Sequence, residues 1–263
     1  MKVSGSRYQT KMIAITREVS PSMSECELTH LPRVEIDIGI ARSQHREYQK
    51  ILTEIGCKVL TLPAEPDLPD SVFIEDTAVV LDELALITRP GAESRRPETH
   101  SVAQILQQYR KLAFIEEPGT LDGGDVLHIG ETLFVGLSER SNTQGIDQLA
   151  RIVAPHGYRV EGVELRGCLH LKSGVSVITP DRLLINPAWI ETSYFKDMDL
   201  IEVDENEPHA ASALYVAGSL IYRTSYPRTR HRIEERDITP RIIDFSEFAK
   251  AEGGLTCCSL IFT

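Results

Sequence analysis

The chain has 263 residues, of which 41% are hydrophobic and 25% are charged. This length suits one large closed domain, such as a barrel or a propeller, but it also allows two smaller domains. The formal net charge of −11 disfavours binding to nucleic-acid phosphates and to anionic lipid, and it is compatible with a cationic small-molecule substrate or with simple solubility.

Five cysteines occur at irregular spacing, which is not the pattern of a disulfide framework. They are Cys26, Cys57, Cys168, Cys257 and Cys258. The N-terminus lacks the basic-then-apolar order of a signal peptide. The longest apolar stretches have the length of strands rather than of membrane-spanning helices. We therefore expect a reduced, cytoplasmic protein that spans no membrane.

Four segments share one pattern: an apolar strand, a two-residue turn and a second apolar strand. This pattern is typical of a β-hairpin. The segments cover residues 78–87, 126–135, 175–185 and 213–222. Their turns begin at residues 82, 130, 180 and 217. The unit therefore recurs about every 40 to 50 residues, which indicates a repeat architecture.

Segments with helical periodicity and further short strands lie between the hairpins. The helical segments include residues 101–109 and 145–153, and the strands include residues 58–62 and 158–163. The repeated unit is therefore predicted to be ββαβ.

The two ends of the chain supply the parts of a fifth hairpin. Residues 12–17 match a second hairpin strand, and residues 258–262 match a first strand. Pairing them would remove the exposed sheet edge that a linear array leaves. We therefore predict one α/β catalytic domain over residues 1–263 rather than two domains. It would be a five-bladed, pseudo-symmetric α/β propeller closed by pairing of the N- and C-terminal strands.

Residues with acid–base or nucleophilic side chains stand just before the first strand of several hairpins. They are Glu75, Asp76, Asp122, His170 and Cys257. Equivalent positions of different propeller blades face the same axial channel, so we expect these side chains to converge. Each residue alone also has a structural explanation. The carboxylates could belong to ordinary turns, and the histidine and the cysteine could pack in a core.

A thiol, an imidazole and several carboxylates in one cleft suit nucleophilic attack on a cationic carbon. Cysteine attacks as the thiolate, and a neighbouring cation lowers its pKa. A guanidinium substrate held by carboxylates could supply that cation, and the imidazole could protonate the leaving amine and then activate water. We expect no metal, because no candidate ligands have structural zinc spacing and because Cys257 and Cys258 would face opposite sides of a strand.

Six motifs, in this order, carry a resemblance to a known family. They are Leu68–Asp76 (LPDSVFIED), Ile87–Arg96 (ITRPGAESRR), Thr120–Val126 (TLDGGDV), Val135–Arg140 (VGLSER), Leu169–Ser173 (LHLKS) and Leu255–Ser259 (LTCCS). With these motifs the chain closely resembles the dimethylargininases of the pentein superfamily over nearly its whole length.

The resemblance implies hydrolysis of N-methylated arginine to citrulline and a methylamine through a covalent thiouronium intermediate, with no cofactor. It implies that Cys257 is the nucleophile, that His170 is the general acid and base, and that Asp122 holds the guanidino group near the histidine. It also implies a set of substrate-binding residues. Glu75 and Asp76 would grip the guanidinium, Phe73 lies in the same motif, Asp70, Arg95 and Arg140 would hold the amino-acid end, and Leu28 would contribute a backbone contact from a lid-like loop.

The implied partner is a small molecule, a methylated arginine, with no nucleic acid or membrane and with a homodimer as the candidate assembly. Other interpretations stay open. Arginine deiminases and amidinotransferases use similar chemistry but are generally longer, and a non-enzymatic ribosome-binding pentein would lack the thiol, imidazole and carboxylate set. The sequence does not decide which substituted arginine is preferred.

Overall fold

The computed structural model describes residues 12–263 and contains five three-stranded sheets. The expectation about a signal peptide concerns the N-terminus, which lies outside these residues. The strands are β1 (Ile13–Arg17), β2 (Lys58–Leu62), β3 (Ala78–Val80), β4 (Leu84–Ile87), β5 (Lys111–Phe114), β6 (Val126–Ile129), β7 (Thr132–Leu137), β8 (Arg159–Glu164), β9 (Val175–Thr179), β10 (Arg182–Ile185), β11 (Asp199–Glu202), β12 (Leu214–Val216), β13 (Ser219–Arg223), β14 (Arg241–Ile243) and β15 (Leu260–Phe262).

All five sheets share one connectivity. The middle strand of each sheet pairs antiparallel with one neighbour and parallel with the other. The orders are β15–β1–β2, β3–β4–β5, β6–β7–β8, β9–β10–β11 and β12–β13–β14. The four predicted hairpins are therefore confirmed. The two ends of the chain also pair as predicted, since Ile15 of β1 lies opposite Leu260 of β15.

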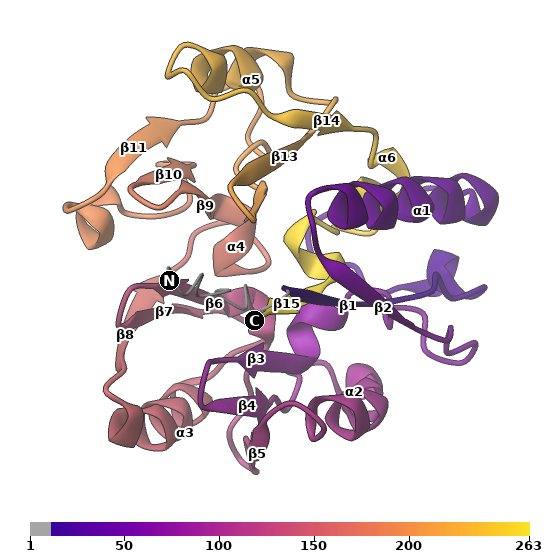
Figure 1. Ribbon diagram of the computed structural model, residues 1–263, viewed down its shortest axis with the longest axis vertical. Helices are drawn as coiled ribbons and strands as arrows, with labels where there is room; N and C mark the ends of the chain where they lie inside the picture. The colour runs from indigo at the N-terminus through magenta and orange to yellow at the C-terminus, as the bar shows by residue number, and fades with distance from the viewer. Residues whose placement is uncertain (1–11) are drawn as a thin grey trace, which may run out of the picture.

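Helices connect the parallel strands, and Figure 1 shows α1, α2, α3 and α5 at the outer edge of the molecule, whereas α4 lies toward its middle. The α-helices are α1 (Ile38–Glu54), α2 (Thr99–Leu106), α3 (Thr143–Val153), α4 (Leu171–Gly174), α5 (Pro227–Glu234) and α6 (Ser246–Lys250). The 3-10 helices are η1 (Met23–Glu25), η2 (Ile74–Thr77), η3 (Glu93–Glu98), η4 (Gly123–Asp125), η5 (Ala154–His156), η6 (Thr192–Phe195) and η7 (Thr256–Cys258). The predicted helices at 101–109 and 145–153 correspond to α2 and α3.

Helix α3 follows directly from its sequence. The side chain of Asn142 caps it by accepting a hydrogen bond from the Gly145 amide at 2.8 Å. Gly145, Leu149 and Val153 are four residues apart and are all buried, so one face of the helix packs on the sheet.

The buried apolar side chains form five clusters, and each cluster joins two sheets. One cluster combines Leu86 of β4 with Val135 of β7, for example. Another combines Ile15 of β1 with Ala85 of β4. The sheets are therefore tied to one another through shared cores. Closure of the five sheets into one complete propeller stays a prediction.

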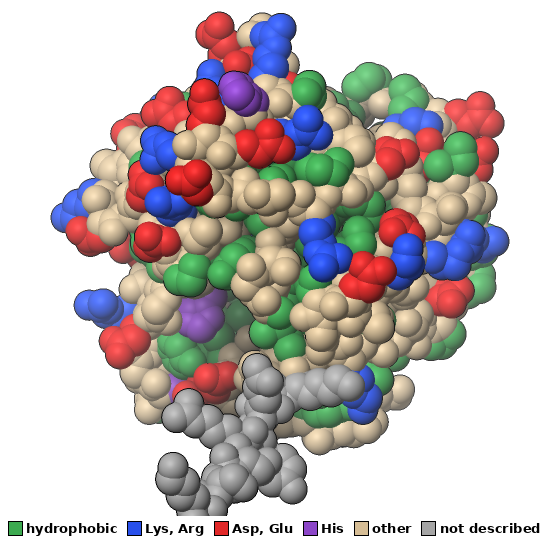
Figure 2. All heavy atoms as spheres, turned by 45° about the horizontal axis from the view of Figure 1, so that its top comes forward, with side chains coloured by type: hydrophobic (Ala, Val, Ile, Leu, Met, Phe, Trp, Pro, Cys, Tyr) green, Lys and Arg blue, Asp and Glu red, His purple; other side chains and the backbone are tan. Residues whose placement is uncertain are grey.

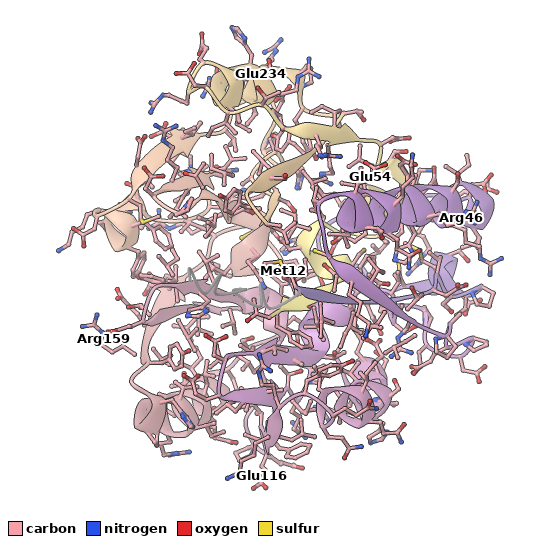
Figure 3. The ribbon with its side chains drawn as sticks, viewed as in Figure 1. Met12, Arg46, Glu54, Glu116, Arg159 and Glu234 are labelled. Carbon is pink, nitrogen blue, oxygen red and sulfur yellow. The ribbon has the colours of Figure 1, made fainter. Side chains whose placement is uncertain are left out.

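Many charged side chains lie at the outside of the molecule, whereas those of the site described below are buried. Figure 3 shows Arg46, Glu116, Arg159 and Glu234 at the periphery, whereas Met12 lies near the middle. On the face shown in Figure 2, acidic and basic side chains are interspersed. Among the helices of residues 12–263, none is both long enough and apolar enough to cross a membrane.

The C-terminal strand begins later than the sequence predicts. Cys257 and Cys258 belong to the 3-10 helix η7, which the Ser259 amide closes by donating to the Thr256 carbonyl, and β15 begins at Leu260. The prediction that the two thiols face opposite sides of a strand is therefore wrong. Successive side chains on a 3-10 helix are instead turned by about 120°, and this rotation separates the thiols. Cys258 is fully buried, whereas Cys257 is partly exposed.

Candidate active site

Four short helical turns bring the predicted residues together. Helix η2 carries Glu75 and Asp76, η7 carries Cys257, and Asp122 and His170 immediately precede η4 and α4. Helix η2 packs against both η4 and η7, and α4 packs against η4. Each turn stands just before the first strand of its sheet. The recurring position in the sequence therefore corresponds to one location in space.

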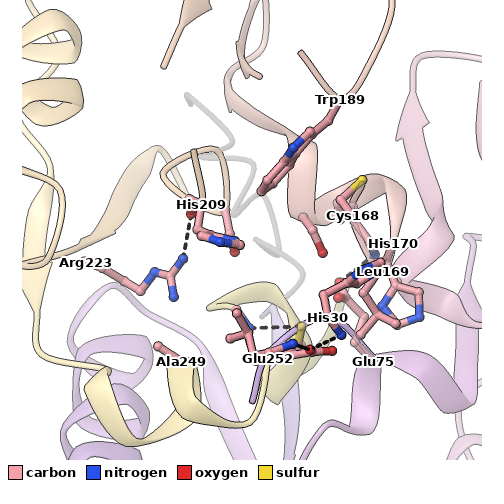
Figure 4. Close-up of a pocket in the computed structure, with 18 of the residues that line it drawn as sticks. His30, Glu75, Cys168, Leu169, His170, Trp189, His209, Arg223, Ala249 and Glu252 are labelled. Carbon is pink, nitrogen blue, oxygen red and sulfur yellow. Dashed lines mark hydrogen bonds and ion pairs between the residues drawn. The ribbon is translucent and has the colours of Figure 1, made fainter. Parts of the chain in front are cut away.

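A pocket of about 200 Å³ opens at these turns, and Glu75, His170 and Cys257 contribute to its wall. Figure 4 shows Glu75 and His170 on the same side of this pocket. Sequence reasoning missed several polar and aromatic side chains that also line it. They include Lys172, Trp189, His209, Arg223, Tyr226 and Glu252. Of these, only Lys172 lies in a quoted motif, LHLKS, and its place two residues after His170 is the one signal that could have found it.

His170 is buried and is surrounded by carboxylates. Its Nε2 atom lies 3.1 Å from Asp122 Oδ2, and its Nδ1 atom lies 3.9 Å from Asp76 Oδ1. Burial alone would lower the pKa of His170, but the neighbouring carboxylates outweigh burial and raise it to about 9. Those carboxylates are Asp76, Asp125 and Asp122. The imidazole is therefore protonated at neutral pH.

Backbone amides fix the two carboxylates beside the histidine. Asp122 Oδ1 accepts from the Gly91 amide at 2.9 Å, and Asp76 Oδ1 accepts from the Gly124 amide at 3.0 Å. Gly124 permits this approach because a Cβ atom there would lie 2.6 Å from Asp76 Oδ1 and 2.8 Å from His170 Nδ1. The glycine-containing turn is thus part of the geometry that places the imidazole.

The Cys257 thiol lies at the pocket wall, and its Sγ atom accepts a hydrogen bond from the Gly254 amide at 3.3 Å. Burial and the nearby carboxylates of Glu75 and Asp76 raise the pKa of Cys257 to about 12. The side chain is therefore a neutral thiol at pH 7. A cation close to Sγ would lower this pKa and favour the thiolate.

Glu75 combines an ion pair with a free acceptor oxygen. Its Oε1 atom lies 2.5 Å from Lys172 Nζ. Its Oε2 atom is buried and has no hydrogen-bond partner among residues 12–263. Burial raises the pKa of Glu75, and Lys172 acts in the opposite direction. The unsatisfied oxygen can accept a hydrogen bond from a ligand N–H group in the pocket.

Asp70, Phe73 and Arg95 do not line this pocket. Arg95 is buried and lies 2.6 Å from Asp76 Oδ2 and 2.9 Å from Glu98 Oε2. Asp70 is buried and accepts from the Glu27 amide at 3.0 Å. The Phe73 ring is also buried and meets the Phe248 ring edge-on, with 6.2 Å between centroids.

Leu28 and Arg140 line a separate hollow. Arg140 Nη2 donates to Thr29 Oγ1 there at 3.1 Å. The structure thus brings Glu75, His170 and Cys257 to one pocket, with Asp76 and Asp122 beside the histidine. The side chains predicted for the amino-acid end lie outside the pocket wall.

Three residues of the site could also bind a metal ion. Asp76, Asp122 and His170 each offer one ligand atom, and these atoms lie within 4.8 Å of one another. The His170–Asp122 contact of 3.1 Å also has the length of a hydrogen bond between an imidazole and a carboxylate. The arrangement therefore suits acid–base chemistry.

Comparison with known proteins relates the chain to enzymes of arginine metabolism. The family model described as arginine deiminase matches residues 64–217. A Pseudomonas aeruginosa protein named N(G),N(G)-dimethylarginine dimethylaminohydrolase is 36% identical over 228 residues, which are 86% of this chain and 90% of that protein. A Streptomyces coelicolor protein of the same name is 39% identical over 251 residues, covering 94% and 95% of the two chains.

Solved structures agree with these relatives. The P. aeruginosa enzyme, as a cysteine-to-serine mutant complexed with citrulline, superposes with a TM-score of 0.90 at 34% identity and covers 95% of this chain and 98% of that one. The N-terminal domain of a cyanobacterial arginine dihydrolase shares the fold at 18% identity, with a TM-score of 0.83 and coverage of 96% and 98%. The resemblance inferred from the six sequence motifs is therefore confirmed, and the chain belongs to the dimethylarginine dimethylaminohydrolase family of hydrolases.

Proposed function

We propose that the protein hydrolyses N-methylated arginine to citrulline and a methylamine through a covalent intermediate on Cys257. The observation that carries this proposal is the pocket in which the Cys257 thiol, the His170 imidazole and the Glu75 carboxylate meet. The names of the P. aeruginosa and S. coelicolor relatives support the substrate class. So does the citrulline complex of the P. aeruginosa enzyme.

Substrate binding would also activate the nucleophile. A guanidinium group can donate to the free Oε2 atom of Glu75, and its charge balances the local carboxylates. The same positive charge near Sγ lowers the pKa of Cys257 from about 12, so that the thiol releases its proton to solvent as the substrate enters.

The first half of the reaction forms the carbon–sulfur bond. The thiolate attacks the guanidinium carbon and gives a tetrahedral adduct. The bond from this carbon to the methylated nitrogen then breaks, and the electron pair stays on nitrogen. The imidazolium of His170 protonates that nitrogen, so a neutral methylamine leaves and a thiouronium group remains on Cys257.

The second half consumes water. The now neutral His170 removes a proton from water as the oxygen attacks the thiouronium carbon. The carbon–sulfur bond breaks, the electron pair returns to sulfur, the sulfur takes up the remaining hydroxyl proton, and neutral citrulline is released. Asp122, bonded to His170 at 3.1 Å, stabilises the imidazolium and fixes the ring orientation throughout.

Contacts to the amino-acid end of the substrate form a further part of the proposal. The family resemblance assigns them to Asp70, Arg95 and Arg140, with Phe73 and Leu28 close by. Arg95 holds two carboxylates in this structure, so substrate binding through Arg95 requires its guanidinium to exchange partners.

We further propose that residues 1–263 form one catalytic domain whose five sheets close into a propeller. The five apolar clusters, each shared by two sheets, support this closure. Cytoplasmic location and a homodimer belong to the same proposal, and sedimentation of the purified protein tests the dimer.

Arginine deiminase activity is the second candidate, because the arginine deiminase family model matches residues 64–217. Purified protein incubated with arginine, monomethylarginine, asymmetric dimethylarginine and agmatine distinguishes the two. We expect citrulline and a methylamine from a methylated substrate, with turnover unaffected by a metal chelator. Faster turnover of plain arginine with release of ammonia would favour the deiminase.

A further inference from the structure

Asp125 is a buried carboxylate to which the proposed reaction gives no role. It is the last residue of η4 and belongs to the same motif as Asp122. It is fully buried and is not part of the pocket wall, so it does not meet a substrate there. Among the ion pairs of residues 12–263, none joins it to a lysine or an arginine. The cation that acts on it most strongly is the imidazolium of His170.

Each oxygen of Asp125 holds a different part of the site. Oδ1 accepts from the Leu171 amide at 3.0 Å, and Leu171 follows His170 at the start of α4. Oδ2 accepts from the hydroxyl groups of Ser138 and Ser141, both at 2.6 Å. Such short distances are typical of hydrogen bonds to an ionised acceptor.

Ser141 extends this contact to Asp122. Its Oγ atom accepts from the Asp122 amide at 3.0 Å while its hydroxyl donates to Asp125. Hydrogen bonds therefore lead from the backbone of Asp122, through Ser141 and Asp125, to the backbone beside His170. The 3.1 Å contact between the side chains of His170 and Asp122 closes this path into a ring. The position of each member of the acid–base pair thus depends on Asp125.

A glycine in the neighbouring strand makes room for this carboxylate. A Cβ atom at Gly136 of β7 would lie 2.7 Å from Asp125 Oδ1 and 3.1 Å from the Leu171 Cβ atom. Hydrogen-bond acceptors alone could be supplied by a neutral side chain. An ionised carboxylate buried without a lysine or an arginine is costly. Its charge is therefore matched to the imidazolium that it faces.

We propose that Asp125 is the positioning residue of the acid–base pair, and that it holds the His170 imidazolium and the Asp122 carboxylate in the arrangement that proton transfer requires. This inference rests on the proposed function, because it concerns the same steps of His170. Asp125 itself transfers no proton. It acts through the backbone beside each partner and through its charge. Since proton transfer needs partners within hydrogen-bond reach, losing Asp125 should slow the chemistry rather than weaken binding.

Asp125→Asn tests the proposal, and Glu207→Gln is the matched control. Asparagine keeps the acceptor for the Leu171 amide, but it loses the charge and cannot accept from both hydroxyl groups. Glu207 is also a buried carboxylate outside the pocket wall, and it accepts from the amides of Arg228 at 3.0 Å and Thr229 at 2.8 Å. We expect kcat for methylated arginine to fall about 10- to 100-fold in Asp125→Asn, with KM changed less than about twofold. Both constants of Glu207→Gln should stay within about twofold of the wild type.

Ser141→Ala separates the hydrogen-bonded path from the charge. It removes the link to Asp122 and leaves the Asp125 carboxylate in place. We expect a smaller fall in kcat, about 3- to 10-fold, as for the loss of one neutral hydrogen bond, again with little change in KM.

Proton NMR reads the positioning without turnover. The imidazolium carries a proton on Nε2, which His170 donates to Asp122. This proton should give a downfield resonance, and His170→Gln identifies the resonance by removing it. We expect the resonance to be lost in Asp125→Asn, because the weakened contact lets the proton exchange with water, and to be retained in Glu207→Gln.

An unchanged resonance or an unchanged kcat in Asp125→Asn would overturn the proposal. So would a loss confined to KM, or equal losses in Asp125→Asn and Glu207→Gln. If Asp125→Asn does not fold, Ser141→Ala decides, and an unchanged kcat and resonance in that variant would overturn the proposal. If the wild type turns over no guanidine, the proposed function fails, and the resonance alone shows whether Asp125 holds the pair.

Discussion

Cys257 and Cys258 are adjacent in the chain but occupy different environments. The Cys257 thiol lines the pocket, whereas Cys258 is fully buried in an apolar cluster with Tyr48 and Phe248. We expect Cys257→Ala to lose nearly all turnover. The matched change Cys258→Ala should keep much of the activity and lower the thermal stability, because it removes a buried sulfur atom.

Mass spectrometry of an acid-quenched reaction identifies the thiol that reacts. The substrate-derived mass should lie on the peptide that contains Cys257 and should be absent in Cys257→Ala. Because both thiols fall in one short peptide, fragmentation must assign the site. An adduct on Cys258, or full activity of Cys257→Ala, would contradict the nucleophile assignment.

His170 should couple catalysis and stability to pH. We expect His170→Gln to reduce turnover about 10²- to 10⁴-fold, because in the proposed mechanism one imidazole serves both the leaving amine and water. The buried carboxylates raise the pKa of His170 from 6.5 to about 9. A raised pKa means that protonation stabilises the fold, fully below about pH 6.5, and that this stabilisation is lost as the pH rises through about 9.

The measurement is thermal unfolding of the wild type and of His170→Gln between pH 6 and pH 10. The stability advantage of the wild type should shrink across the upper half of this range. A difference between the two proteins that does not change with pH would mean that His170 is not held as an imidazolium by its neighbours.

At the level of elements, the short helical turns before the first strand of each sheet position the residues of the site. A substitution at Gly124 in η4 tests this. A Cβ atom there would lie within 3.0 Å of both Asp76 and His170, so Gly124→Ala must displace the imidazole. We expect kcat/KM to fall by about 100-fold, the loss that misplacement by about 1 Å can cause. Gly162→Ala in β8 is the control, because its Cβ atom would meet nothing closer than Leu137 at 3.8 Å.

Steady-state kinetics and melting curves of the two glycine variants give the readout. Activity of Gly124→Ala equal to that of Gly162→Ala would show that the turn does not position His170. A parallel loss in both variants would indicate general destabilisation instead.

The hairpins and the recurring polar position could be predicted because both are written in local sequence. Strand alternation and turn residues mark each hairpin, and the repeat places Asp122 and His170 at one phase. The pocket walls could not be predicted in the same way. The amide partners of Glu252 lie more than 200 residues away, and Arg223 meets the pocket through contacts with His209 and Tyr226 that no motif encodes. The 3-10 turn at Cys257 was missed because a single turn has no periodicity to detect.

The shared apolar clusters suggest that the whole molecule unfolds as one unit. Strand β1 belongs to the sheet formed by the two chain ends. Its residue Ile15 is fully buried in a cluster with Ala85 and Ile87 of β4. Ile15→Ala should cost about 2–5 kcal/mol of unfolding free energy, through lost burial and the remaining cavity. For a protein of this size that corresponds to a fall of roughly 4–20 °C in Tm.

Calorimetry of Ile15→Ala, with Ile40→Ala as the control, tests this. Ile40 is 47% exposed on α1, so the same chemical change there should leave Tm nearly unaltered.

If the chain forms one closed domain, the wild type and both variants should each show a single unfolding transition with equal calorimetric and van't Hoff enthalpies. Cys257 stands three residues before β15, so activity should be lost in the same transition. A second resolved transition in the wild type, or loss of the β15–β1–β2 sheet while the other sheets persist, would contradict a single cooperative domain.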